Sequence, residues 1–156
     1  MTIVVTLLGA TLLVGCDRAP NNTHNIFYND LTEQQLLGHW TIINYWAGWC
    51  KPCLEEIPEL NRLHQQLKQS PEPTGAQVFA VNFDGLVRDE LRIESEKLGV
   101  NVPLILNDPS TSLGFDRPTV LPTTLIFNPQ GQLQYTLLGP QTLQSLNQLI
   151  GLTEEP

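Results

Sequence analysis

Apolar and polar residues follow two different patterns along the middle of the chain. Residues 40–46 are almost all β-branched or aromatic, which is typical of a buried central strand. From Cys50 to about Gln69, the apolar positions recur at helical spacing instead: Leu54, Ile57, Leu60, Leu63 and Leu67. The pattern therefore predicts a buried strand that runs directly into an amphipathic helix.

The remaining elements are predicted from the same two hydrophobic patterns and from turn residues. They are strands over 77–83, 123–127 and 132–138, a helix over 89–98 and a closing helix that ends at about Ile150. Residues 104–106 form a third, short apolar run, followed by a loop. Asp89 is the expected N-cap of the middle helix, and Gly99 lies just past its end. Residues 128–131 (Asn-Pro-Gln-Gly) are typical of a turn between two strands.

Composition narrows the class of protein. The chain has 156 residues, of which 41% are hydrophobic and 15% charged, as in a globular protein with one domain. Its net charge of −8 argues against a nucleic-acid partner, because phosphate binding requires a basic face. We expect a monomer.

The first residues resemble a targeting signal. Residues 3–15 are almost purely apolar, a run shorter than the roughly 20 residues of a membrane span but suited to a secretory signal. The run ends in Leu13-Val14-Gly15-Cys16, which resembles the bacterial lipobox, although no Lys or Arg precedes it. A buried N-terminal strand or helix is the alternative. The lipobox reading divides the chain into a signal peptide (1–15), a polar tether (16–30) and a folded domain (31–156).

That reading also predicts a location. Cys16 would carry acyl chains that hold the mature protein on the membrane. Asp17 resembles the signal that keeps lipoproteins on the inner membrane, so the domain would face the periplasm. The periplasm is an oxidising compartment, in which a reactive cysteine pair has a function.

Cys50 and Cys53 form a Cys-x-x-Cys motif at the predicted start of a helix. The unpaired amide N–H groups of a first helical turn favour negative charge and lower the pKa of a thiol there. Cys50 is therefore the expected nucleophile, and Cys53, one turn deeper, the resolving cysteine. Lys51 adds a positive charge beside Cys50.

Metal and haem sites explain this motif less well. Structural zinc needs four ligands, but there is no second cysteine pair, and His24, His39 and His64 lack ligand spacing. Covalent haem attachment needs His at position 54, which is Leu54. We expect no metal and no cofactor.

Two separated motifs resemble a known family. Residues 46–53 (Trp-Ala-Gly-Trp-Cys-Lys-Pro-Cys) are similar to the thioredoxin active site, and residues 56–60 resemble its membrane-tethered TlpA/ResA/DsbE-type subgroup. Residues 121–127 (Leu-Pro-Thr-Thr-Leu-Ile-Phe) resemble the cis-proline strand of that fold. The resemblance covers roughly residues 31–150. It implies a thioredoxin fold: a mixed sheet of four or five strands flanked by helices, with a central βα insertion around residues 87–99.

The resemblance also assigns roles to residues outside the motif. A cis bond before Pro122 would set the backbone of Leu121 against the sulfurs, where it can pair with an extended substrate. Asn44 occupies the position at which cytosolic thioredoxins carry a buried acid. Glu56 is the expected substitute, because it follows Cys53 by three positions on the same helix face, although it could instead only complement the helix dipole in solvent.

The two tryptophans near the motif have different expected roles. Trp46 is expected to pack in the core. Trp49, directly before Cys50, is expected to lie over the site and to form an apolar docking patch.

The resulting expectation is a periplasmic thiol–disulfide oxidoreductase that reduces protein disulfides, for example in cytochrome c maturation. Its partners would be protein thiols and disulfides and a membrane electron donor. Two alternatives remain: a copper-binding assembly factor and a cysteine peroxidase. The first would use a distal His, yet none follows His64, and the second would have Thr at position 47, which is Ala47.

Overall fold

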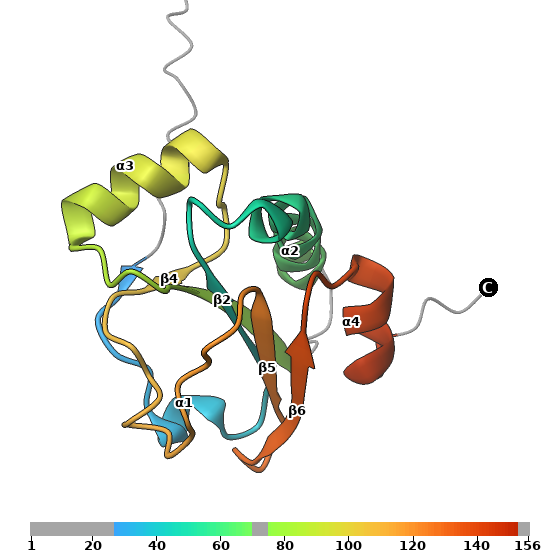
Figure 1. The fold of residues 1–156 in the computed structure, drawn as a ribbon. Helices are drawn as coiled ribbons and strands as arrows, with labels where there is room; N and C mark the ends of the chain where they lie inside the picture. The colour runs from blue at the N-terminus through green and yellow to red at the C-terminus, as the bar shows by residue number, and fades with distance from the viewer. Residues whose placement is uncertain (1–26, 70–74, 153–156) are drawn as a thin grey trace, which may run out of the picture.

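The computed structural model describes residues 27–69 and 75–152, which form one mixed sheet with helices on both faces (Figure 1). The strands are β1 (Phe27–Tyr28), β2 (Trp40–Trp46), β3 (Ala76–Asn82), β4 (Leu104–Ile105), β5 (Thr123–Phe127) and β6 (Leu133–Leu138). The helices are α1 (Glu33–Leu36), α2 (Lys51–Gln69), α3 (Arg88–Leu98) and α4 (Leu143–Leu149). The predicted α/β class is confirmed.

The strand order is β1-β4-β3-β2-β5-β6. The central strand β2 pairs in parallel with β3 and antiparallel with β5. β4 extends the parallel half beside β3 and β1, whereas β5 and β6 form an antiparallel hairpin. Because β2 is flanked on both sides, six of its seven residues are buried, which explains its continuous apolar and β-branched sequence.

Two apolar clusters pack on opposite faces of the sheet. The larger one joins the sheet to α2, α3 and α4, through Ile57 and Leu60 of α2, Leu91 of α3 and Leu146 of α4. The smaller one lies against the other face, where α1 and the segment between β4 and β5 cover the sheet (Figure 1). This arrangement places the start of α2 at the carboxyl end of β2.

Four details of the predicted architecture are wrong. The sheet has six strands rather than four or five. Residues 27–28, assigned to the tether, form β1 and pair with β4, so the folded domain begins before residue 31. The insertion between β3 and β5 runs helix first, as α3 and then β4. Helix α3 begins at Arg88 with Val87 as its N-cap, which places Asp89 inside the first turn.

Candidate active site

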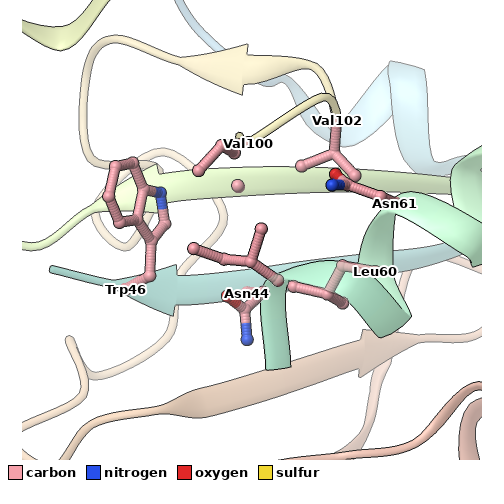
Figure 2. A pocket seen from close by; sticks show the side chains of 8 residues that line it. Asn44, Trp46, Leu60, Asn61, Val100 and Val102 are labelled. Atoms are coloured by element: carbon pink, nitrogen blue, oxygen red, sulfur yellow. The ribbon is translucent and has the colours of Figure 1, made fainter. Parts of the chain in front are cut away.

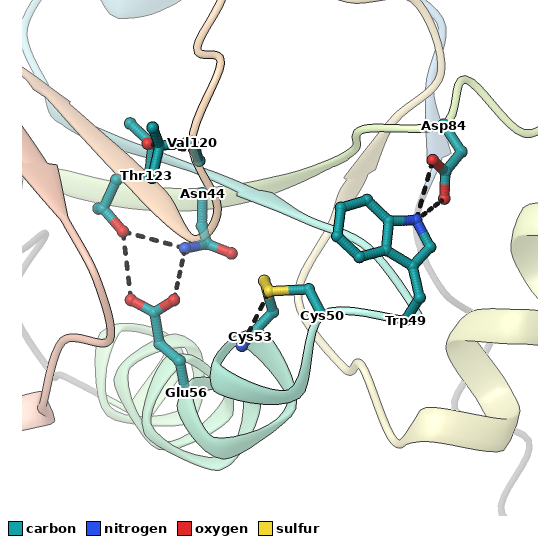
Figure 3. The surroundings of a disulfide bond; sticks show 9 residues. Asn44, Trp49, Cys50, Cys53, Glu56, Asp84, Val120 and Thr123 are labelled. Carbon is teal, nitrogen blue, oxygen red and sulfur yellow. Dashed lines mark hydrogen bonds between the residues drawn. A yellow bond between two sulfur atoms is a disulfide. The ribbon is translucent and has the colours of Figure 1, made fainter.

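The cysteine pair lies where β2 passes into α2. Cys50 and Cys53 form a disulfide with their Cα atoms 5.3 Å apart, and both are buried, at 5% and 1% exposure. The backbone N–H of Cys53 donates a hydrogen bond to Sγ of Cys50 at 3.3 Å (Figure 3). An amide of the first helical turn therefore points at the Cys50 sulfur, and this geometry favours a thiolate there.

The bond between Leu121 and Pro122 is cis, as expected. Pro122 is buried directly before β5, and its carbonyl oxygen accepts a hydrogen bond from the N–H of Gly139 at 2.9 Å. Thr123 donates its hydroxyl to the carbonyl of Val120 at 2.7 Å, which closes the turn around the proline. Val120 lies in the surroundings of the disulfide and is 52% exposed (Figure 3).

Glu56 is a buried carboxylate one helical turn beyond Cys53, with 1% exposure. Its Oε2 accepts a hydrogen bond from Nδ2 of Asn44 at 2.8 Å. Its Oε1 accepts from the hydroxyl of Thr124 at 3.2 Å and from the N–H of Gln141 at 3.0 Å. Figure 3 shows Asn44 above Glu56 and beside the disulfide. The hypothesis of a solvated Glu56 is therefore wrong.

Burial governs the proton affinity of this carboxyl group. It raises the pKa of Glu56 above its ordinary value, although the hydrogen bonds from Gln141, Asn44 and Thr124 act in the opposite direction. A raised pKa brings Glu56 closer to the range in which a carboxyl group exchanges protons with a thiol. The exposed neighbour Glu55 points away from this network, as its helical position predicts.

The two tryptophans differ in burial, as expected. Trp46 is 1% exposed and lies in the core, beside a small pocket that it lines with Asn44, Leu60 and Val100, among others (Figure 2). Its Nε1 has no hydrogen-bond partner among the described residues. Trp49 is 68% exposed, and its Nε1 donates to both carboxylate oxygens of Asp84, at 3.1 and 3.2 Å (Figure 3).

A second polar network supports the segment that leads to the cis-proline. Asp108 accepts hydrogen bonds from the Tyr45 hydroxyl at 2.9 Å and from Nε of Arg117 at 2.7 Å. Arg117 also donates to the carbonyl of Phe83, and its guanidinium lies over the Phe83 ring, 4.2 Å from the centroid. The network thus joins the ends of β2 and β3 to the segment before Leu121.

The electrostatics of this network stabilise it. Burial alone would raise the pKa of Asp108, but hydrogen bonds from Ser110, Arg117 and Tyr45 outweigh burial and hold it below its ordinary value. Burial, together with Asp108, raises the pKa of Tyr45, so this phenol stays protonated. Sequence reasoning missed Tyr45, Asp108 and Arg117, because no motif links positions so far apart.

Metal-binding groups and membrane-spanning helices are both absent from the described residues. In residues 27–69 and 75–152 no three or more His, Cys, Asp or Glu side chains gather into a group that could hold a metal ion. Within the same ranges, no helix has the length and apolar character needed to cross a membrane. Cys16 and the predicted signal and lipobox lie outside the described residues.

Comparison with known proteins agrees with this geometry. The family model described as "AhpC/TSA family" matches residues 17–136, which is more than half of the chain. The chain belongs to the AhpC/TSA family. This family is thioredoxin-like, which agrees with the observed fold.

Individual relatives are similar over most of the chain. Thiol-disulfide oxidoreductase ResA of Geobacillus kaustophilus is 27% identical over 111 residues, which cover 70% of this chain and 60% of the relative. ResA of Oceanobacillus iheyensis is 33% identical over 113 residues, covering 71% of this chain and 55% of the relative. The chain thus spans less than two thirds of the length of these curated relatives.

The fold is also shared with solved structures. A secreted thiol-disulfide isomerase from Corynebacterium glutamicum superposes with a TM-score of 0.63 and 26% identity, covering 78% of this chain and 75% of the other. A DsbF homologue from Corynebacterium diphtheriae gives a TM-score of 0.61 at 23% identity, covering 76% and 74% of the two chains. The predicted thioredoxin-like fold is therefore confirmed.

Proposed function

We propose that this protein is a thiol–disulfide oxidoreductase that cycles between a Cys50/Cys53 dithiol and disulfide. The observation that carries the proposal is the hydrogen bond from the Cys53 amide to Sγ of Cys50, at the start of a 19-residue helix and beside a cis-proline turn. An amide at a helix start stabilises a thiolate, and the thiolate is the species that attacks a disulfide.

Reduction of a substrate disulfide takes two exchange steps at the cysteine pair. The Cys50 thiolate attacks one sulfur of a substrate disulfide, forms a mixed disulfide and releases the other substrate sulfur as a thiolate. Cys53 then loses its proton and attacks Sγ of Cys50, which releases the second substrate sulfur. Two electrons have passed to the substrate, which takes up two protons, and the Cys50–Cys53 disulfide remains. A dithiol donor must reduce that disulfide before the next turnover.

Glu56 is the group that we assign to the proton of Cys53. The two residues lie one turn apart on one face of α2, and both are 1% exposed. Bulk water therefore has poor access to the Cys53 thiol. The raised pKa of the Glu56 carboxyl group suits it to accept that proton during resolution and to return it during reduction.

The surface around the pair suits a protein substrate. Trp49 and Val120 are both large apolar residues with more than half of their surface exposed, and both lie in the surroundings of the disulfide (Figure 3). Leu121 lies between Val120 and the cis-proline, where its backbone can pair with an extended segment. We therefore assign substrate binding to Trp49 and Leu121, and positioning of the Leu121 backbone to Pro122.

We further propose an extracytoplasmic location and a reductive direction. Leu13-Val14-Gly15-Cys16 supports a lipid anchor on Cys16, with Asp17 favouring retention on the inner membrane and the domain facing the periplasm. The resemblance to the TlpA/ResA/DsbE-type subgroup supports reduction of protein disulfides, including those of cytochrome c maturation, with electrons from a membrane donor. The protein would act as a monomer.

The decisive experiment measures the redox equilibrium of the purified domain against glutathione and a reference thioredoxin. Reduction potentials in this fold run from about −270 mV, the value of thioredoxin, to about −120 mV. A reductase requires a potential near the first of these values. An equilibrium near the oxidising end would overturn the reductive direction. Failure to exchange with either reference, combined with peroxide turnover or bound copper, would favour the peroxidase or the copper-binding assembly factor instead.

A further inference from the structure

Glu94 of α3 contacts the loop that carries the nucleophile. The Glu94 side chain lies so close to Gly48 that a Cβ atom at that glycine would overlap the carboxylate, and Leu98 lies 3.5 Å from the same point. Gly48 is two residues before Cys50. Its φ is not positive, so an alanine at this position would strain no backbone and would displace only the flexible end of the Glu94 side chain.

Within the part of the chain that the structure describes, no ion pair neutralises the Glu94 carboxylate. The ion pairs among the described residues join Arg62 to Glu59, Arg92 to Glu96 and Arg117 to Asp108. Glu94 is in none of them, and it is half-buried. A negative charge in this setting is screened less than a fully exposed one.

The other charges near Cys50 are mixed in sign. Lys51 follows Cys50 and is exposed, whereas Asp84 accepts the Trp49 N–H and Glu56 is buried behind Cys53. On α3 itself, Glu90 and Lys97 lie one turn on either side of Glu94 and are both exposed. The helix-start amide and Lys51 therefore favour the Cys50 thiolate, and acidic groups oppose them.

We propose that Glu94 sets the redox poise of the pair: its carboxylate, held against Gly48, destabilises the Cys50 thiolate and so makes the dithiol a stronger reductant. The proposal rests on the thiol–disulfide activity proposed above. When the nucleophilic thiolate is strongly stabilised, the dithiol form is favoured, so the disulfide form is a strong oxidant. When the thiolate is less stabilised, the dithiol form gives up its electrons more readily, so the pair tends to reduce its partners. The inserted helix α3 would thereby bias a thioredoxin-like site toward reduction.

The test compares three single variants of the full chain and the Glu94→Gln/Gly48→Ala double variant. Glu94→Gln removes the charge and keeps the shape, Glu96→Gln removes a charge that Arg92 already pairs on the same helix, and Gly48→Ala pushes the carboxylate away from the loop. The readouts are the pH midpoint of Cys50 alkylation in the reduced protein and the equilibrium constant with glutathione. Alkylation is followed by mass spectrometry at Cys50.

Glu94→Gln should lower the pH midpoint of Cys50 alkylation by about half a pH unit, because the Cys50 thiolate then binds its proton about threefold more weakly. The same change should make the cysteine pair less reducing. Gly48→Ala should shift the midpoint in the same direction, and the double variant should add little, because both changes remove one interaction. Glu96→Gln should leave the midpoint unchanged.

Two outcomes would overturn the proposal. The first is an unshifted midpoint in Glu94→Gln, and the second is an equal shift in Glu96→Gln, which would indicate only the general charge of the helix. Either result leaves the proposed function intact as long as the wild-type protein exchanges disulfides. A wild-type protein that does not exchange would refute the proposed function itself.

Discussion

Asn44 donates a hydrogen bond to Glu56 across the interior, with 2.8 Å between Nδ2 and Oε2. The bond joins the central strand to the helix that begins with the redox motif. Asn44 also donates to the Thr124 hydroxyl at 3.0 Å, so β2, α2 and β5 share one buried polar network. A network of this kind is stable only while each donor and acceptor has a partner, which makes the protonation state of Glu56 consequential.

Glu56→Gln should change the pH dependence of stability. The pKa of Glu56 is raised in the folded state, so the folded protein binds more protons than the unfolded one above pH 4.5. The wild type should therefore lose stability relative to Glu56→Gln as pH rises from 4.5 toward the raised value, at up to about 1.4 kcal/mol per pH unit. Urea unfolding of both proteins across this range measures the difference.

The matched control is Glu55→Gln, which removes a carboxylate from the exposed face of the same helix turn. Its stability should stay parallel to that of the wild type at every pH. Parallel curves for Glu56→Gln as well would show that the buried carboxyl group has an ordinary pKa, and its assigned role in proton transfer would then lose its basis.

The two cysteines should react unequally. Cys50 is the more exposed of the pair, at 5% against 1%, and it receives the amide N–H of Cys53. In the reduced protein it alone should alkylate rapidly below neutral pH. Cys53→Ser should accumulate mixed disulfides with partner proteins, because the resolving thiol is gone, and Cys50→Ser should accumulate few. Mass spectrometry of the trapped species would name the substrates. Faster alkylation of Cys53 would reverse the assigned roles.

Trp49→Ala should impair the reduction of proteins more than that of small disulfides. The side chain is 68% exposed and lies beside the pair, so its loss removes apolar docking area and costs little stability. We expect a severalfold higher KM for a protein disulfide and a nearly unchanged rate with oxidised glutathione. Leu37→Ala, which truncates another exposed apolar residue at 53% exposure, is the control. Equal losses with both substrates would indicate a disturbed active site instead.

Asp108→Asn should destabilise the protein at neutral pH and not in acid. The hydrogen bonds from Ser110, Arg117 and Tyr45 hold the folded pKa of Asp108 below 3.8, so its contribution is present above that pH and is lost as pH falls through the lowered value. We expect a loss of about 1–3 kcal/mol at pH 7, measured by urea unfolding. The difference from the wild type should close at low pH. Asp116→Asn, at an exposed position nearby, should show no such pattern.

Cys16→Ser tests the anchor independently of the redox chemistry. If Cys16 receives lipid, the substitution should abolish labelling with a radioactive or alkyne fatty acid and should leave the precursor unprocessed. Disulfide exchange by the folded domain should be unaffected. A variant that stays membrane-bound with unchanged mass would show that residues 1–15 hold the protein in another way.

Local pattern was sufficient for much of the fold. The bounds of β2 and β5 match the prediction, and α2 begins at the residue after Cys50, because a fully buried strand and an amphipathic helix have distinct periodicities. Gly99 ends α3 with a φ of 70°, a conformation that glycine adopts at no steric cost. The order of the redox motif and the proline turn along the sequence is sufficient to indicate a thioredoxin-like family.

Short elements and helix starts were not predictable in the same way. β1 and β4 have two residues each, so neither shows a period, and they exist as strands because the sheet edge pairs them. α1 has four residues and is stabilised by the capping box of Thr32 and Gln35, together with the burial of Leu36. Asp89 has the side chain of an N-cap, but the N-cap of α3 is Val87, two residues earlier, and Asp89 lies in the first turn.

The amino-acid pattern alone was enough for the core of the chemistry: a cysteine pair at a helix start and a carboxylate one turn beyond it. These are local facts, since helical geometry brings Cys50, Cys53 and Glu56 together without help from the rest of the chain. The environment in which this chemistry operates depends on the tertiary fold. The partners of Glu56 lie 12, 68 and 85 positions away, and Glu94 reaches Gly48 from a separate helix. Burial and charge depend on such long-range contacts, which periodicity and spacing do not encode.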